Sequence, residues 1–266
     1  MSKGYFFIAL GEYYIDECVL LANTIRKQKD YKPISLLIHP KNESYARSKN
    51  IFDQLINFIP NDLLWNECHT DFEKYCLYPR INFEKYIPYD ENIIVDSDVL
   101  CQAPADNLWN ILSNQEMPIR MLGRLHDPNW HWGAIGEVSK AYGKHIPHVH
   151  GGFFYLRKNK FLDDFFSYSR EVFYKYDEYK CKRAFRGGRV DEIIFAIAHS
   201  YYNMPPVEFD DVPAMTFNYD SSITVPSKLQ TEGGQNIQLD DYIPFVHMFD
   251  KMAGKNFKNL YERIMK

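Results

Sequence analysis

Two aspartates separated by one serine are the residues whose types and spacing most clearly suggest chemistry. Asp96 and Asp98 follow an apolar run at 93–95, which predicts a buried strand of a parallel sheet. Residues i and i+2 of an extended chain point to the same side, so the two carboxylates should repel each other unless a cation lies between them. Ligands of open α/β sheets bind at the carboxyl ends of strands. The pair therefore predicts a divalent metal site, although an isolated Asp-x-Asp is a weak signal.

The hydrophobic pattern predicts the elements that must position this pair. Strands are expected at 5–10, 34–38, 56–59, 92–95, 119–122, 149–156 and 245–248, and helices at 15–27, 80–86, 105–112, 161–176, 191–202 and 256–266. Residues 123–147 are expected to form an irregular surface region. The opening strand, helix and strand indicate a parallel pair, so we expect an α/β fold in a single domain, 1–266.

Composition and charge exclude some classes of partner. The chain is 45% hydrophobic and 25% charged, which suits a soluble protein with a full core, and its net charge of −4 argues against a nucleic-acid partner. The scattered cysteines lack metal-site spacing, and no apolar run reaches membrane-spanning length. These features predict a cytoplasmic protein with reduced thiols.

The neighbourhood of the aspartates resembles the retaining glycosyltransferases of family eight, the glycogenin and lipopolysaccharide galactosyltransferase type. The blocks that carry this resemblance are Tyr78-Pro79-Arg80, the strand into Asp96-Ser97-Asp98, and Asn107-Leu108-Trp109. Further blocks follow the family's order: Ile8-Ala9-Leu10-Gly11 with Tyr14, Val149-His150-Gly151-Gly152-Phe153, Asp191-Glu192, and the segment 247–255.

The resemblance implies a GT-A-like fold, a mostly parallel central sheet flanked by helices. Residues 1–104 would bind the nucleotide sugar, and residues 105–266 would bind the acceptor and carry a C-terminal metal and phosphate loop. The implied reaction is metal-dependent transfer of a hexose from a nucleotide diphosphate sugar, expected to be a UDP-sugar, to a glycan or other hydroxyl acceptor, with retention of configuration.

The resemblance also implies roles for individual residues. Asp96, Asp98 and His247 would be metal ligands, and this mixture of oxygen and imidazole suits Mn²⁺ better than Mg²⁺. The implied catalytic residues are Asp191 and Glu192. The residues expected to bind the donor and its metal are Ala9, Leu10, Tyr14, Arg80, Asp96, Ser97, Asp98, Gly152, Lys251 and Lys255.

The sequence departs from the family pattern at several positions. His150 stands where the family usually has Asn, and Glu192 stands where it usually has Gln. In the C-terminal loop Asp250 and Ala253 replace a Gly and a Lys, which leaves Lys251 and Lys255 as alternatives for the diphosphate. Asp191-Glu192 is also similar to the blood-group-type transferases of family six, in which a Glu can act as nucleophile. That family lacks a His ligand, so His247 favours family eight.

Several of these residues have ordinary structural interpretations as well. His247 could be a core residue, Arg80 a surface ion pair, and the two acids at 191–192 could simply favour a helix N-terminus. The basic segment 180–189 is either a solvated loop or a lid over the diphosphate. The basic C-terminal helix is either a solvated face or a peripheral membrane contact.

Two alternative functions come from other classes. A sugar-phosphate nucleotidyltransferase typically has a Gly-rich loop after its first strand, whereas this chain has Gly11-Glu12-Tyr13-Tyr14, with one glycine and no lysine. A catalytically inactive carbohydrate-binding relative would not need the aspartate pair together with His247.

Overall fold

The computed structural model describes residues 1–126, 135–184, 187–208, 212, 214–218, 243–248 and 251–266. Its strands are β1 (Lys3–Ala9), β2 (Ile34–Ile38), β3 (Gln54–Asn57), β4 (Glu91–Val95), β5 (Val99–Cys101), β6 (Ile119–Arg124), β7 (His148–Arg157), β8 (Val207–Glu208), β9 (Met215–Asn218) and β10 (Phe245–Met248). Its longer helices are α1 (Glu12–Lys27), α2 (Glu43–Ser48), α5 (Asp106–Ser113), α6 (Ile135–Tyr142), α7 (Lys160–Tyr174), α8 (Asp191–Tyr201) and α9 (Lys255–Met265). Short helical turns are η1 (Pro40–Asn42), α3 (Leu63–Asn66), η2 (Glu73–Leu77), α4 (Tyr78–Arg80) and η3 (Phe83–Lys85).

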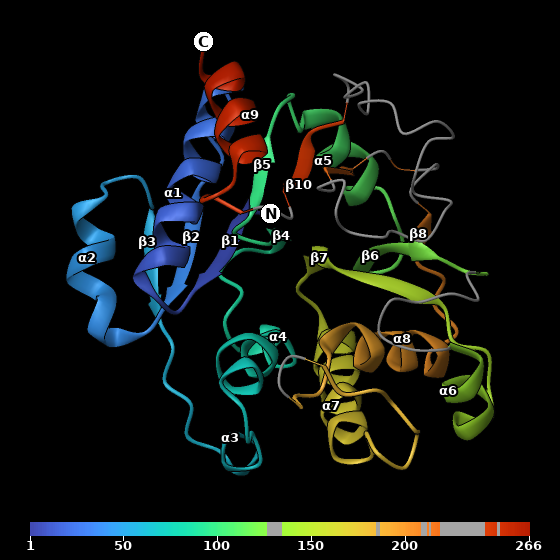
Figure 1. Cartoon of the computed structure of the whole chain (residues 1–266). Coiled ribbons are helices and arrows are strands. Elements are labelled where there is room, and N and C mark those ends of the chain that lie inside the picture. The colour runs from blue at the N-terminus through green and yellow to red at the C-terminus, as the bar shows by residue number, and fades with distance from the viewer. Residues whose placement is uncertain (127–134, 185–186, 209–211, 213, 219–242, 249–250) are drawn as a thin grey trace.

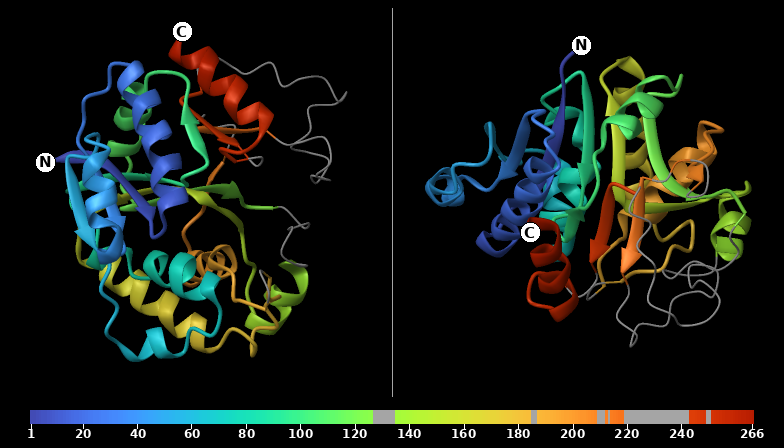
Figure 2. Two further views of the ribbon diagram at one scale, coloured as in Figure 1. Left: turned by 60° about the vertical axis from the view of Figure 1, so that its left-hand side comes forward. Right: turned by 90° about the horizontal axis from the view of Figure 1, so that it is seen from above.

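The described strands form two sheets. A seven-stranded sheet has the order β3-β2-β1-β4-β7-β6-β8, and a three-stranded sheet has the order β5-β10-β9. Among the described strands of the larger sheet, β7 runs antiparallel to both of its neighbours and all other neighbours are parallel. Helices cover both faces (Figures 1 and 2). The prediction of an α/β fold with a mainly parallel, helix-flanked sheet is confirmed.

Strand β1 shows why the sheet is buried on both faces. Successive side chains of a strand point to opposite faces. Phe6 accordingly joins the apolar cluster under α7 and α8, whereas Tyr5 and Phe7 join the cluster under α1 and α5. A strand that is covered twice must be apolar throughout, which is why its sequence does not alternate.

Two of the expected elements were wrong in position or type. The helix expected at 80–86 begins earlier and is broken into the short turns η2, α4 and η3. Pro79 suits the start of α4, because the first residues of a helix need no N–H partner. Within the irregular region expected at 123–147, α6 forms around Ile135 and Val138, which lie on one buried face at helical spacing.

Candidate active site

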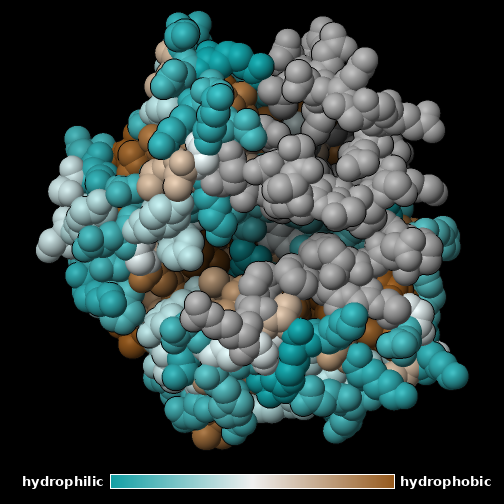
Figure 3. All heavy atoms as spheres, viewed as in Figure 1, coloured by the Kyte–Doolittle hydropathy of each residue, from teal (hydrophilic) through white to brown (hydrophobic). Residues whose placement is uncertain are grey.

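The aspartate pair lies where β4 ends, at the carboxyl edge of the larger sheet. Asp96 follows β4 directly, and its backbone N–H donates to the carbonyl of Gly152 at 3.2 Å. Asp98 immediately precedes β5, which belongs to the smaller sheet. The face drawn in Figure 3 is hollowed near its middle, where hydrophilic and hydrophobic side chains are both visible. The motif thus occupies the turn by which the chain passes from one sheet to the other.

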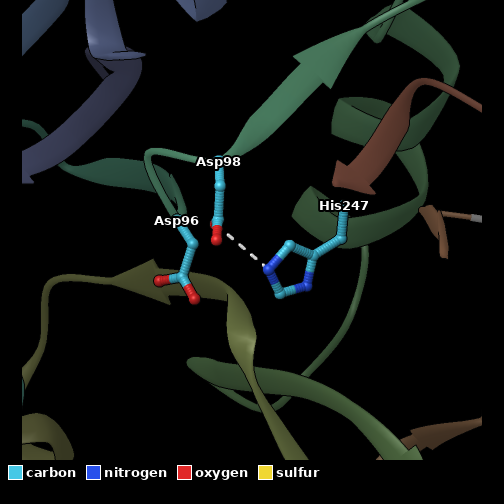
Figure 4. Close-up of side chains that lie close together, drawn as sticks. All are labelled: Asp96, Asp98 and His247. Atoms are coloured by element: carbon cyan, nitrogen blue, oxygen red, sulfur yellow. Dashed lines mark hydrogen bonds and ion pairs between the residues drawn. The ribbon is translucent and has the colours of Figure 1, made fainter. Parts of the chain in front are cut away.

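His247 reaches this turn from the far end of the chain through strand pairing. Strand β10 runs antiparallel to β5 and places His247 opposite Val99. His247 Nε2 lies 3.1 Å from Asp98 Oδ1 (Figure 4). One ligand atom from each of Asp96, Asp98 and His247 falls within 4.8 Å of the others. Two carboxylates and an imidazole at this spacing form a donor set that fits a divalent transition metal.

Asp96, Asp98 and His247, called the trio below, have the electrostatics of a site that favours a bound cation. Burial raises the pKa of Asp96 to about 6, against the opposing charge of Arg80 and with the help of the negative charge of Asp98. Burial also acts to raise the pKa of Asp98, but the charge and hydrogen bond of His247 outweigh it and lower that pKa. Asp98 in turn raises the pKa of His247 against the effect of burial. Partly buried carboxylates this close repel each other, and bound positive charge relieves that repulsion.

Arg80 is held between two acidic side chains. Its guanidinium pairs with Asp96, and Nη1 donates to Asp191 Oδ2 at 2.6 Å and to the carbonyl of Gly151 at 3.2 Å. The expected contact with a diphosphate would have to share this guanidinium with both carboxylates. Arg80 therefore links Asp96, a candidate metal ligand, to Asp191, the first residue of α8.

The double glycine lets β7 pass close beneath these side chains. Because β7 is antiparallel to β4, its early residues lie beside the carboxyl end of β4. A Cβ atom on Gly151 would lie 3.0 Å from Asp191 Oδ2, and one on Gly152 would lie 2.6 Å from His150 Cε1. Glu192 Oε1 accepts the N–H of Gly151 at 2.8 Å. The strand, the two candidate catalytic acids and Arg80 are thus packed without room for a side chain at 151–152.

The start of α1 and the C-terminal loop complete one wall. Lys251 Nζ lies 4.0 Å from Asp98 Oδ2 and 5.9 Å from the ring centre of Tyr14, whose side chain is exposed. The Ser97 hydroxyl donates to Glu17 Oε2 at 2.6 Å. The other oxygen of Glu17 accepts the N–H of Met252 at 3.2 Å.

The remaining expected donor-binding residues lie at different distances from the trio. Ala9 is buried at the end of β1, and Leu10 follows it with its carbonyl accepting from Asn42 Nδ2 at 3.2 Å. Lys255 is exposed at the start of α9 and makes no described contact with the trio. Of the two lysines left open by the sequence, Lys251 is the one that the structure brings to the aspartates.

The C-terminal helix uses its apolar face inside the protein. Phe257 and Leu260 are buried and pack in one cluster with Leu20 of α1. The outward side carries basic residues such as Lys258 and Arg263. A membrane contact through α9 would therefore be electrostatic and would lack an apolar anchor. Within the described residues, no helix is both long and apolar enough to span a bilayer.

Sequence reasoning missed two buried acids beside the site, Glu17 and Glu73. Both side chains are fully buried. Glu17 lies on the buried face of α1 among residues such as Cys18 and Leu21, and a charge on an otherwise apolar face was the available signal. Glu73 had no such signal, because the turns around it have no clear period.

Comparison with solved structures identifies the fold. The chain superimposes on mouse xyloside xylosyltransferase 1, with 8% identity, a TM-score of 0.58 and coverage of 93% of this chain and 97% of that one. It superimposes on the galactosyltransferase LgtC in complex with donor and acceptor sugar analogues, with 12% identity, a TM-score of 0.60 and coverage of 99% and 96%. A third match is an active-site mutant of LgtC with glutamate in place of glutamine, at 13% identity, a TM-score of 0.60 and coverage of 98% and 95%.

These neighbours are glycosyltransferases of family eight. The sequence identity is low, but the structural likeness extends over nearly the whole chain and establishes a shared GT-A fold. No protein-family model matches the chain, and no curated protein matches its sequence.

Proposed function

We propose that this chain is a metal-dependent glycosyltransferase that transfers a hexose from a UDP-sugar to a glycan or other hydroxyl acceptor with retention of configuration. The observation that carries the proposal is the convergence of Asp96, Asp98 and His247 on one point at the carboxyl edge of a GT-A sheet. The structure of LgtC with donor and acceptor sugar analogues supports a two-substrate reaction at this kind of site.

In this proposal one set of residues at the site stabilises the leaving diphosphate, and another set acts on the sugar. A divalent ion held by Asp96, Asp98 and His247, with Mn²⁺ the expected metal, would supply Lewis-acid charge at the diphosphate. Lys251 would add positive charge on the same side, and the exposed ring of Tyr14, whose centre lies 5.9 Å from Lys251 Nζ, would stack on the base. Charge that builds on the departing diphosphate is stabilised best by groups that are already oriented before the reaction.

Asp191 and Glu192 would act at the sugar carbon. Both acids begin α8, where the helix dipole stabilises negative charge. Asp191 is already paired with Arg80, whereas Glu192 accepts the neutral backbone N–H of Gly151. We therefore favour Glu192 as the carboxylate that stabilises or attacks the developing oxocarbenium ion. The LgtC mutant carries glutamate in place of an active-site glutamine. By the family resemblance, Glu192 of this chain likewise stands where the family usually has glutamine.

A thermal-shift experiment with UDP tests the proposal. UDP should raise the melting temperature in the presence of Mn²⁺ and should have little effect in the presence of EDTA. UMP is the matched control, because it keeps the base and ribose but lacks the diphosphate that would meet the metal. An equal shift with UDP in EDTA, or an equal shift with UMP and UDP, would contradict the metal-bridged diphosphate. A panel of nucleotide sugars, assayed for Mn²⁺-dependent release of UDP, would then identify the donor.

A further inference from the structure

The side chain of Glu73 is a buried junction between two segments that are far apart in the sequence. It has no exposed surface. Oε2 accepts the backbone N–H groups of His69 at 2.7 Å and Thr70 at 3.3 Å. Oε1 accepts the backbone N–H of Arg189 at 3.0 Å and its Nη1 at 2.8 Å. Both oxygens thus accept hydrogen bonds. Oε2 accepts them from the turn that leads into η2, and Oε1 accepts them from Arg189, two residues before α8 begins.

The charge on Glu73 is stabilised by these contacts. Burial acts to raise its pKa, but the hydrogen bonds from Arg189 and His69 and the charge of the Arg189 guanidinium outweigh burial, so the net pKa is lowered. The Arg189 guanidinium also lies over the ring of Phe173, at 4.1 Å from its centre. A buried carboxylate that keeps its charge in this way holds a fixed geometry, because losing either partner leaves the other unpaired.

The residues around Arg189 are fastened to the same support. A Cβ atom on Gly188 would lie 2.8 Å from the hydroxyl oxygen of Thr70, so the two segments touch through the glycine backbone. The N–H of Val190 donates to the hydroxyl of Tyr176 at 3.0 Å. The chain that enters α8 is therefore held at residues 188, 189 and 190 in turn.

These contacts close a ring through the candidate active site. Glu73 and Arg80 belong to one run of short helical turns, and Arg189 and Asp191 belong to the entry of α8. Glu73 joins the two segments at one end, through Arg189. Arg80 joins them at the other end, through Asp191 at 2.6 Å. A shift of either segment would move Arg80 and the acids of α8 relative to each other.

We propose that Glu73, through Arg189, is a positioning residue of the reaction centre, which holds Asp191 and Glu192 in register with Arg80 and the metal ligand Asp96. This inference rests on the function proposed above. It also gives the end of the basic segment 180–189 a role other than a lid, because Arg189 is committed to a buried acid. Misplacement of catalytic groups by about 1 Å can cost roughly a hundredfold in rate, so a support of this kind affects turnover more than donor binding.

The test compares Glu73→Gln with a matched control, Glu91→Gln. Glu91 is also buried and accepts hydrogen bonds, from the hydroxyls of Tyr155 at 2.8 Å and Ser113 at 2.5 Å, but it begins β4 at the end opposite to Asp96. In the Glu73 variant the amide replaces one of the two acceptor oxygens, so one set of N–H donors loses its partner. We expect kcat of Mn²⁺-dependent donor turnover to fall by about ten- to a hundredfold, with the Kd for UDP and Mn²⁺ within about twofold of the parent.

The control fixes how each result is interpreted. Glu91→Gln should keep the parental kcat, because it weakens the ion pair with Lys3 at 3.3 Å but leaves an amide oxygen that can accept from both hydroxyls. Parental kcat in a folded Glu73→Gln would overturn the positioning role, and so would an equal loss of kcat in both variants. If Glu73→Gln does not fold, Arg189→Lys tests the same contact, because it keeps the charge and the backbone N–H but loses the planar guanidinium. A parent protein that neither binds UDP with Mn²⁺ nor turns over any donor would overturn the proposed function itself, whereas an active parent with an active Glu73→Gln would overturn only the positioning role.

Discussion

The two aspartates of the motif differ in their partners. Asp96 is paired with Arg80, whereas Asp98 is hydrogen-bonded to His247 and faces Lys251. Asp96 therefore has a cation of its own within the protein, and Asp98 depends more on groups that would themselves face the diphosphate. Removal of Asp98 is for this reason the cleaner test of metal binding.

Asp98→Ala should abolish Mn²⁺-dependent binding of UDP while leaving the protein folded. A ligand to the metal should be worth more than a supporting hydrogen bond, whose loss typically costs about 10–100-fold in metal affinity. Isothermal titration of UDP into Mn²⁺-loaded protein measures the effect, and circular dichroism checks the fold. Asp90→Ala, at an exposed position near the start of β4, is the control. Parental affinity in Asp98→Ala would remove Asp98 from the metal site.

Glu192→Gln should lower turnover by at least about tenfold, a barrier change of roughly 1.4 kcal/mol. The amide oxygen can still accept the N–H of Gly151, so the fold and the KM for donor should change little. An amide can stabilise a cation but attacks poorly. Steady-state kinetics of Glu192→Gln and Asp191→Asn, measured side by side, separate the two acids. Parental kcat in the first variant beside an inactive second would transfer the role to Asp191.

At the scale of elements, α8 links the candidate site to the deepest core. Its residues from Asp191 to Ser200 are all buried. His199 donates from Nδ1 to the Phe195 carbonyl at 2.8 Å, and its ring lies edge-on to Phe165. Burial, helped by the charge of nearby Arg120 and opposed by the hydrogen bond to Phe195, lowers the pKa of His199 to about 4. The helix thus carries two buried acids at its start and a buried neutral histidine near its end.

This histidine makes stability sensitive to mild acid. Between pH 6.5 and about 4 the unfolded chain binds a proton at His199 that the folded protein excludes, so the contribution of His199 to the free energy of unfolding falls as the pH is lowered through this range. The loss should be about 2 kcal/mol between pH 7 and pH 5. Urea unfolding at the two pH values measures it, and His199→Leu should show a correspondingly smaller difference. An unchanged difference in His199→Leu would assign the sensitivity to other groups.

Element types were predictable where apolar runs are unbroken, whereas the hydrophobic pattern alone predicted no contacts between distant side chains. The apolar runs of β4, β7 and β10 predicted these strands correctly because each strand is buried. Asp191 and Glu192 were singled out by the order of the family's sequence blocks. The pairing of Arg80 with Asp191 and of Glu73 with Arg189 was not predicted, because the hydrophobic pattern does not relate segments more than a hundred positions apart. Asp98 and His247, which are 149 positions apart, were brought together only by the family resemblance. The turns at 73–85 were missed because Pro79 and the shortness of the helical segments interrupt the helical period.

At the scale of the molecule, the two expected halves, 1–104 and 105–266, are interleaved rather than separate. Strand β4 from the first half pairs with β7 from the second, and β5 pairs with β10. Each half therefore completes a sheet of the other. The two halves can still differ in the ligand that each would contact, but they are not two independently folded units.

A fragment of residues 1–104 should consequently fail to fold alone. It would leave β4 without β7 and β5 without β10, and it would expose apolar surface that α7 and α8 cover. Thermal melting followed by circular dichroism should show no cooperative transition for the fragment and one for the full chain. A cooperative transition of the isolated fragment at a similar temperature would show that the first half is an autonomous domain.

The contact between Asp98 and His247 spans 149 positions of the chain. A divalent ion shared by these residues would be a removable cross-link around a very long loop, and the entropy that a cross-link withdraws from the unfolded chain grows with the logarithm of loop length. Strand β10 carries one end of that link, and helix α9 is attached downstream of it. Chelation should therefore loosen the last part of the chain first, and a protease added with EDTA should begin its digestion there. The resistance of the C-terminal segment to cleavage would then report how fully the protein is loaded with metal.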